Sequence, residues 1–138
     1  TSRGGNMNFG VNGTAAMNVS NATFIARQLT HGGYALNLPG SNPRGGTSTI
    51  DVWDGGLLEV TEAYDWISDN AGQPHTLTVH AGGRLALPPT TRIAGSTGTA
   101  TVALDGGVLA CHPGGARGTL DDLMQGVDVF ALAAGSSS

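Results

Sequence analysis

The sequence predicts an all-β chain folded as a right-handed parallel β-helix, or β-solenoid, of about five coils. Three observations predict this fold: a recurring glycine pair, alternating apolar residues beside each pair, and few aromatic or charged residues. The last glycine of each unit is residue 5, 33, 56, 83, 107 or 135, so the steps are 28, 23, 27, 24 and 28 residues. A fixed repeat of this size is typical of solenoids, in which each repeat stacks on its neighbours.

The glycine pairs predict tight turns between strands. Such a turn needs a residue at positive φ and room for the backbone of the neighbouring coil. The pairs are Gly4-Gly5, Gly32-Gly33, Gly55-Gly56, Gly82-Gly83 and Gly106-Gly107, with Ala134-Gly135 as a degenerate sixth. The expected coils are therefore about 1–33, 34–56, 57–83, 84–107 and 108–135, in a single domain of residues 1–135.

The strand after each pair shows period-two alternation, which directs one set of side chains into a core. The expected inward residues are Met7 and Phe9, Leu58 and Val60, Leu85 and Leu87, and Leu109 and Cys111. After Gly33 the pattern is shifted by one residue, to Leu36 and Leu38, which predicts a local irregularity there.

The strand before each pair allows two registers. Ile50 and Val52 precede the second glycine by six and four positions, whereas Val102 and Leu104 precede it by five and three. The steps also alternate between long and short, and residues 49–58 match residues 100–109 at an offset of 51, which suggests a module of two coils. The alternative fold is a β-sandwich, although its turns usually fall every 8–12 residues or so.

Composition and charge exclude several classes of protein. Glycine supplies 23 of 138 residues, aromatic residues 5% and charged residues 12%, which suits coils filled with aliphatic ladders. The six arginines are scattered, there is no lysine and the net charge is −4, so no basic stripe for nucleic acid is expected. The sequence contains no run of about 18 apolar residues, so no membrane helix is predicted. Cys111 is expected to be a buried, inert thiol, and no cofactor is expected.

The ends of the sequence predict a piece of a longer or processed polypeptide. The sequence opens on Thr1 without a start methionine or signal peptide, and residues 136–138 are interpreted as a cut end or linker. Uncapped coils would leave strand edges open. The expected partners are therefore further coils of a parent chain or copies of this segment stacked end to end.

Residues 78–87 and 102–109, each a strand, a glycine pair and a second strand, resemble repeats of bacterial autotransporter passengers and related haemagglutinin-like surface proteins. The resemblance covers most of the chain. It implies a secreted or surface-displayed β-helix that serves as an adhesin or stalk, although no translocator barrel is visible in the sequence.

Two sets of residues are candidates for an enzyme site. Polysaccharide lyases and glycosidases use paired carboxylates, and acidic residues cluster at Asp51, Asp54, Glu59, Glu62, Asp65 and Asp69, with a pair at Asp121-Asp122. Such residues are normally solvated, and no polygalacturonase-type motif is present. His75 and His80 are five residues apart and so point to opposite faces of a strand, and a stacked pair of His31 and His80 is less favoured than two surface histidines. No catalytic or metal-binding residue is predicted.

Trp53, Tyr64 and Trp66 form the strongest binding candidate, because exposed aromatic side chains on a β-face stack against sugar rings. Trp53 is expected to point outward if Ile50 and Val52 point inward. The competing interpretation makes residues 62–68 a loop whose aromatic side chains pack on the coil. Three sequons, at Asn12, Asn18 and Asn21, predict a glycosylated face if the source organism glycosylates secreted proteins.

The sequence therefore predicts a structural and adhesive segment of a secreted or cell-surface fibrous protein, without catalysis. The alternatives are a carbohydrate-active β-helix enzyme that uses the acidic stretch and a non-catalytic glycan-binding module that uses the three aromatic residues.

Overall fold

The computed structural model describes residues 2–9, 13–31, 47–66, 74–87, 93–94, 99–111 and 129–135. Within these residues the regular secondary structure consists of strands, and no helix is assigned. Their bounds are β1 (Ser2–Phe9), β2 (Ala15–Val19), β3 (Thr23–His31), β4 (Ser48–Val52), β5 (Leu57–Trp66), β6 (Pro74–His80), β7 (Arg84–Leu87), β8 (Ile93–Ala94), β9 (Thr99–Asp105), β10 (Val108–Cys111) and β11 (Val129–Leu132). With no helix in these ranges, none is long and apolar enough to cross a membrane.

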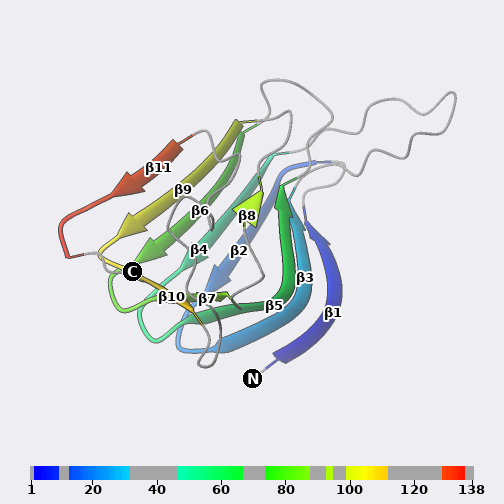
Figure 1. Ribbon diagram of the computed structural model, residues 1–138, viewed down its shortest axis with the longest axis horizontal. Helices are drawn as coiled ribbons and strands as arrows, with labels where there is room; N and C mark the ends of the chain where they lie inside the picture. The colour runs from blue at the N-terminus through cyan, green and yellow to red at the C-terminus, as the bar shows by residue number, and fades with distance from the viewer. Residues whose placement is uncertain are drawn as a thin grey trace, which may run out of the picture.

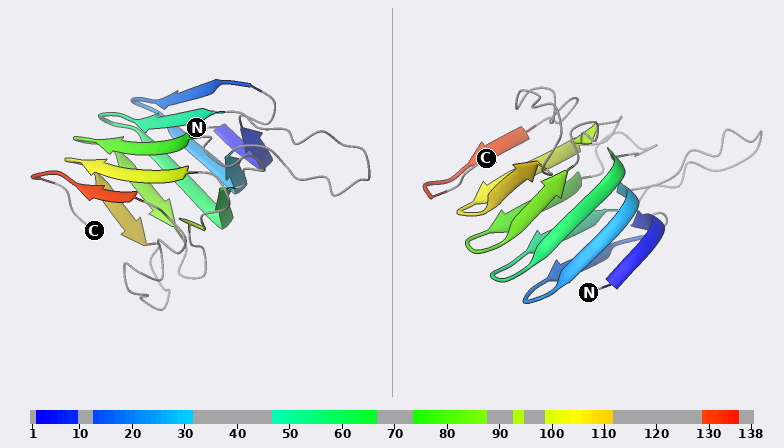
Figure 2. Two further views of the ribbon diagram at one scale, coloured as in Figure 1. Left: turned by 90° about the horizontal axis from the view of Figure 1, so that it is seen from above. Right: turned by 60° about the horizontal axis from the view of Figure 1, so that its bottom comes forward.

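The strands form two sheets in which all strand pairs are parallel. Sheet A has the order β1-β3-β5-β7-β10, with β8 beside β5, and sheet B has the order β2-β4-β6-β9-β11. Along the chain the strands alternate between the sheets, β8 aside, so each sheet grows by one strand per repeat (Figures 1 and 2). The prediction of an all-β chain is confirmed, and its strands are parallel. The two sheets are open along their outer strands.

Sheet B turns one face toward the core. Ile50 pairs with Leu77 and Leu77 with Val102, while Val52, Val79 and Leu104 form the next row. All six side chains are at most 1% exposed, and the residues between them face outward. Burying each such aliphatic side chain contributes about 1.5–3 kcal/mol to folding, so these rows are a main source of stability.

Sheet A supplies the opposite wall of the core. Leu58, Leu85 and Leu109 are buried in one row, and Val60 and Leu87 are also buried, which confirms the inward positions predicted for these residues. Ala86, between Leu85 and Leu87, is buried as well, so the alternation does not extend to it. Met7 is partly buried against the same core. The backbone of Cys111 pairs with that of Leu87, and its side chain lies outside the described residues, as do Leu36 and Leu38.

The pairing of β3 with β5 contains an irregularity. Ala26 pairs with Val60 but Gln28 pairs with Ala63, so β5 has one residue more than β3 at this point. Arg27 and Glu62 lie beside this bulge and form an exposed ion pair with an N–O distance of 3.4 Å. Residues 62–66 belong to β5, so the interpretation of residues 62–68 as a loop is wrong for these five residues, and residues 67–68 lie outside the described part of the chain.

The glycine turns have the predicted geometry, and each glycine has its own role. The first glycine is at positive φ, with +65° at Gly55 and +76° at Gly82 and Gly106. The second glycine lies against the strand of sheet B that belongs to the repeat before its own. A Cβ atom at Gly56, Gly83 or Gly107 would clash with a carbonyl oxygen, that of Val19, Val52 or Val79 respectively.

The first turn is not where the glycines predict it. Gly4 and Gly5 lie inside β1, and the turn equivalent to Gly55-Gly56 is formed by Asn21 and Ala22. Asn21 has φ +47°, a conformation that asparagine tolerates better than most residues. Ala22 has room for its Cβ because β2 is the outer strand of sheet B in the described part of the chain. Gly32 and Gly33 lie outside the described residues.

The turns also explain the two registers before the glycine pairs. Three residues separate Val52 from Gly56, but only two separate Leu104 from Gly107, although Val52, Val79 and Leu104 share one row. The offset of 51 therefore holds after the turn, between Leu57 and Val108, which both pair with Arg84. Before the turn the offset is 52 rather than the predicted 51, and the shorter turn absorbs the difference.

Candidate functional site

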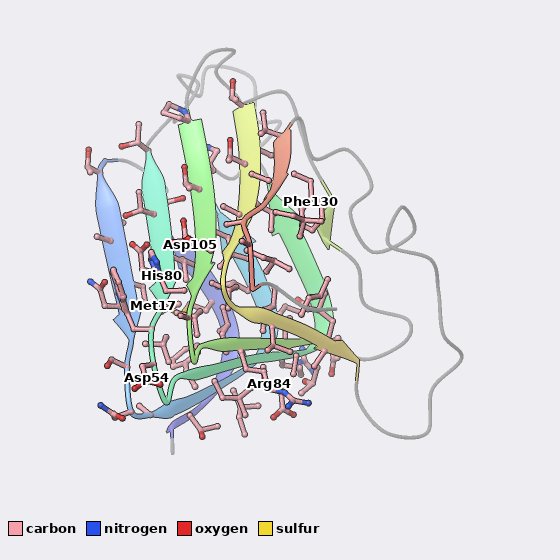
Figure 3. All side chains as sticks on the ribbon, turned by 90° about the vertical axis from the view of Figure 1, so that its left-hand side faces the viewer. Met17, Asp54, His80, Arg84, Asp105 and Phe130 are labelled. Carbon is pink, nitrogen blue, oxygen red and sulfur yellow. The ribbon has the colours of Figure 1, made fainter. Side chains whose placement is uncertain are left out.

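The candidate site lies on the outer face of sheet B, where its strands enter the glycine turns. Trp53, His80 and Asp105 each follow a residue of the buried row Val52, Val79 and Leu104. Because side chains alternate along a strand, the residues after an inward row project outward. Figure 3, which faces sheet B, shows His80 and Asp105 close together, with Asp54 in the turn below them.

Trp53 is the central side chain of this site. Its indole ring stacks face to face on the imidazole ring of His80, with 3.6 Å between centroids and 5° between the ring planes. Its Nε1–H donates a hydrogen bond to Oδ1 of Asn18 at 3.0 Å. The side chain is nevertheless 42% exposed. Trp53 is thus an exposed aromatic residue whose orientation is fixed from two sides.

His80 is held between two carboxylates. Its Nε2 is 3.0 Å from Oδ1 of Asp51, and its Nδ1 is 3.4 Å from Oδ2 of Asp105. A doubly protonated imidazole donates to both carboxylates, whereas a neutral ring donates through one nitrogen only. In the doubly protonated form, the two carboxylates therefore fix the plane of the ring on which Trp53 stacks.

A surface depression of about 630 Å³ runs along this row. Its lining includes Ser20, Trp53, Asp54, His80, Asp105 and Ala134. Two of these residues, Asp54 and Asp105, carry carboxylates, two, Trp53 and His80, carry aromatic rings, and none is arginine. The arrangement can stack a flat ligand on the indole while carboxylate oxygens accept hydrogen bonds from it.

The backbone separates Trp53 from the other two predicted aromatic residues. Tyr64 and Trp66 lie at the end of β5 in sheet A, where their backbones pair with Leu29 and His31. Trp53 instead follows β4 in sheet B, on the other side of the glycine turn. The side chains of Tyr64 and Trp66 lie outside the described set, so the site is built on Trp53.

The predicted sequon asparagines fall in three places. Asn18 is on β2 and contacts Trp53, Asn21 is exposed in the first turn, and Asn12 lies outside the described residues. A glycan on Asn18 would compete for space with any ligand on Trp53.

The acidic stretch divides between the two sheets. Asp51 is on β4 and Asp54 follows it in the turn, whereas Glu59 and Glu62 are on β5. Asp65 is also on β5, but its side chain is not described, and Asp69, Asp121 and Asp122 lie outside the described residues. The described members of the stretch, Asp51, Asp54, Glu59 and Glu62, therefore do not form one carboxylate cluster.

The histidines separate as their spacing predicts. His75 is 1% exposed and faces the core, where its Nδ1 is 2.9 Å from Oγ of Ser48, whereas His80 faces outward. Burial lowers the pKa of His75 below its usual value of 6.5. His31 is on β3 of sheet A and His80 on β6 of sheet B, so the two residues are not on neighbouring strands. No group of three or more His, Cys, Asp or Glu side chains in the described ranges could hold a metal ion.

The partners of Trp53 could have been found from the spacing of the glycine pairs. His80 lies 27 residues after Trp53, and the step from Gly56 to Gly83 is also 27. Equal offsets place the two side chains in one outward row. The same spacing does not predict Asp105, because the turn after β9 is one residue shorter and the offset from His80 no longer equals the step between the glycine pairs.

Neither the known protein families nor the curated proteins nor the solved structures contain a match to this chain.

Proposed function

We propose that this chain is a structural and adhesive segment of a right-handed parallel β-helix, in a secreted or cell-surface fibrous protein, without catalysis. The observation that carries the proposal is the alternation of strands between two parallel sheets, so that each repeat adds one strand to each. Five such repeats are β1–β2, β3–β4, β5–β6, β7–β9 and β10–β11. A right-handed path is the default for crossovers between parallel strands.

A stalk or adhesin is a fitting use of this architecture. Each repeat advances along the axis by one strand spacing, about 4.8 Å, and the buried rows run through the successive repeats. The resemblance of the repeats to autotransporter passengers and haemagglutinin-like proteins supports the same proposal. The proposed partners are further coils of a parent chain or stacked copies, because β2 and β11 pair on one side only within the described residues.

The adhesive contact is proposed to be a glycan stacked on Trp53. Sugar rings pack their C–H faces on aromatic rings, and the indole at this position is exposed and already oriented by Asn18 and His80. Binding to a panel of neutral, cationic and acidic oligosaccharides, measured by calorimetry, tests this contact. Trp53→Ala is expected to abolish binding, whereas Trp66→Ala, at the far end of β5, is expected to leave it intact.

The enzyme alternative has one observation in its favour, the two carboxylates Asp51 and Asp105 on either side of His80. Incubation with the corresponding polysaccharides, followed by assay of released reducing ends or unsaturated products, distinguishes it. We expect no product. Turnover that is lost in Asp51→Asn or Asp105→Asn would overturn the non-catalytic proposal.

A further inference from the structure

We propose that copies of this chain stack head to tail, with Leu132 of one copy inserted into a depression beside Val19 of the next; this inference rests on the proposed partnership between stacked copies. β11 of the first copy would thereby become a further strand of sheet B in the second copy, beside β2. The two outer strands of sheet B therefore supply the two halves of one contact.

The inserting surface is β11, the outer strand at one end of sheet B. Leu132 pairs with Leu104 in the inward row, yet its side chain is 59% exposed, whereas that of Leu104 is 1% exposed. Phe130 pairs with the buried Val102 and is itself only partly buried. Apolar side chains grouped on an outer strand favour pairing with another chain. β11 thus carries residues of the core rows that are open to solvent.

The receiving surface is β2, the outer strand at the opposite end of sheet B, and Figure 3 labels Met17 and Phe130 at these two ends (Figures 2 and 3). A depression of about 350 Å³ runs along β2 and the start of β3. Its lining contains no charged residue and consists of Met17, Asn18, Val19, Ser20, Ala22, Thr23 and Phe24. Met17 and Phe24 are partly buried and pack against the core. The depression therefore suits an apolar side chain.

The register of sheet B brings the two surfaces into line. One inward row crosses five neighbouring strands and contains Val19, Val52, Val79, Leu104 and Leu132. If β11 of a second copy continues this pairing beyond β2, its Leu132 lies beside Val19 and its Phe130 beside Met17. Leu132 then enters the depression, where Val19 and Phe24 contact it. The row that ends in an exposed leucine in one copy would continue as a buried row in the next.

The backbone of sheet B indicates the hydrogen bonds that the junction would add. Where β11 pairs with β9, the N–H of Ala133 donates to the carbonyl oxygen of Leu104 at 2.9 Å. By the same repeat, the N–H of Ser20, which follows Val19, is expected to donate to the carbonyl oxygen of Leu132 in the second copy. Addition of a strand to an open sheet edge is a recurring mode of recognition, in which the backbone supplies affinity and side-chain pockets supply specificity.

The two surfaces are different parts of one molecule, so the contact between copies is heterologous. A contact of this kind does not close between two copies and instead continues into an open series. Neither β11 nor the lining of the depression contains a charged residue. Burial of apolar surface, rather than attraction between charges, is therefore expected to drive the association.

Sedimentation velocity of the full chain over a range of concentrations tests the junction. We expect the average mass to rise with concentration and to pass the mass of a dimer, and added salt should not weaken the association. A chain that stays monomeric, or that stops at a dimer, would overturn the junction. Either result would leave the glycan contact of Trp53 standing, because the oligosaccharide panel tests that contact separately.

Two variants of β11 assign the association to Leu132. Leu132→Asp is expected to weaken it about tenfold or more, because the junction would otherwise bury a leucine side chain. Val129→Asp is the matched control, since Val129 is on the same strand and 47% exposed but lies on the outward face. It should leave the association unchanged, and both variants should keep the native far-ultraviolet circular dichroism spectrum. Equal effects of the two variants would contradict the insertion of Leu132.

A mixture of two blocked variants tests the head-to-tail direction. Leu132→Asp retains the depression, whereas Met17→Asp retains Leu132 and places a charge in the depression. Each is expected to be monomeric alone, and an equimolar mixture is expected to form a dimer with one copy of each and nothing larger. If Met17→Asp does not fold, Ser20→Pro replaces it, because proline removes the N–H expected to bond Leu132. A mixture that stays monomeric, or that grows beyond the dimer, would overturn the proposal.

Discussion

The backbone of Gly83 lies so close to the carbonyl oxygen of Val52 that a Cβ atom at position 83 would clash with it. The two residues are 31 positions apart in the sequence, and the contact joins one glycine turn to the preceding strand of sheet B. The same relationship recurs between Gly56 and Val19 and between Gly107 and Val79. The second glycine of each pair is thus a packing residue.

Gly83→Ala is therefore expected to destabilise the protein. The clash is with backbone, so the turn has to move, and overpacking of this kind costs about 1–3 kcal/mol in unfolding free energy. Gly5→Ala is the matched control, because Gly5 has no neighbouring atom within 4 Å of an added Cβ. Urea unfolding of both variants measures the difference, and equal stability of the two would contradict the role given to Gly83.

Asn21 provides a test of the first turn. Its φ of +47° is unfavourable for most side chains but accessible to asparagine and glycine. Asn21→Ala is expected to lower the unfolding free energy by about 1 kcal/mol, whereas Asn21→Gly should leave it unchanged or raise it. If thermal unfolding shows glycine to be the worse substitution at this position, the turn is not at residues 21–22.

Residues 76 and 77 test the inward and outward faces of sheet B. Leu77 is fully buried and its neighbour Thr76 faces outward. Leu77→Ala is expected to cost about 2–5 kcal/mol, the usual range for a buried leucine, and Thr76→Ala about 1 kcal/mol or less. Chemical denaturation of both variants gives the comparison, and a reversed order would mean that the strand has the opposite register.

His75 predicts a dependence of stability on pH. Burial lowers the pKa of His75 in the folded protein below the value of 6.5 that it has when unfolded. Below pH 6.5 the unfolded chain therefore binds a proton that the folded protein does not, so stability is present above this pH and is lost as the pH falls. The slope for one such group is at most about 1.4 kcal/mol per pH unit.

His75→Asn is the control for this prediction. Its amide can retain a hydrogen bond with Ser48 and does not titrate. Unfolding free energies measured from pH 7.5 to pH 5 should fall more steeply for the native protein than for the variant. Parallel pH profiles would show that His75 does not carry the effect.

Much of the fold follows from local patterns in the sequence. The alternation at Leu58 and Val60, and the glycine pairs at residues 55–56, 82–83 and 106–107, reflect backbone and burial constraints that act in every repeat. Gly4 and Gly5 do not form a turn, and the sequence does not reveal this, because a glycine pair inside a strand looks the same as one in a turn. Asn21-Ala22 was missed because an outer strand relaxes the need for a second glycine.

The site was only partly predictable for a related reason. The exposure of Trp53 follows from its position after an inward row, but its grouping with Tyr64 and Trp66 used closeness in sequence, and β5 extends away from the turn. Its contact with His80 depends on which strand lies beside β4. That neighbour is β6, with the whole of β5 between them in the chain.

The parallel pairing of β4, β6 and β9 is the central claim, and cross-strand nuclear Overhauser effects between the methyl groups of Ile50, Leu77 and Val102 test it most directly. In the arrangement described here, Leu77 lies between the other two, so contacts from Leu77 to both are expected. A β-sandwich with antiparallel hairpins would instead pair β4 with β5 across the glycine turn. Backbone contacts between β4 and β5 in antiparallel order, without the contacts of Leu77 to Ile50 and Val102, would contradict the parallel two-sheet fold.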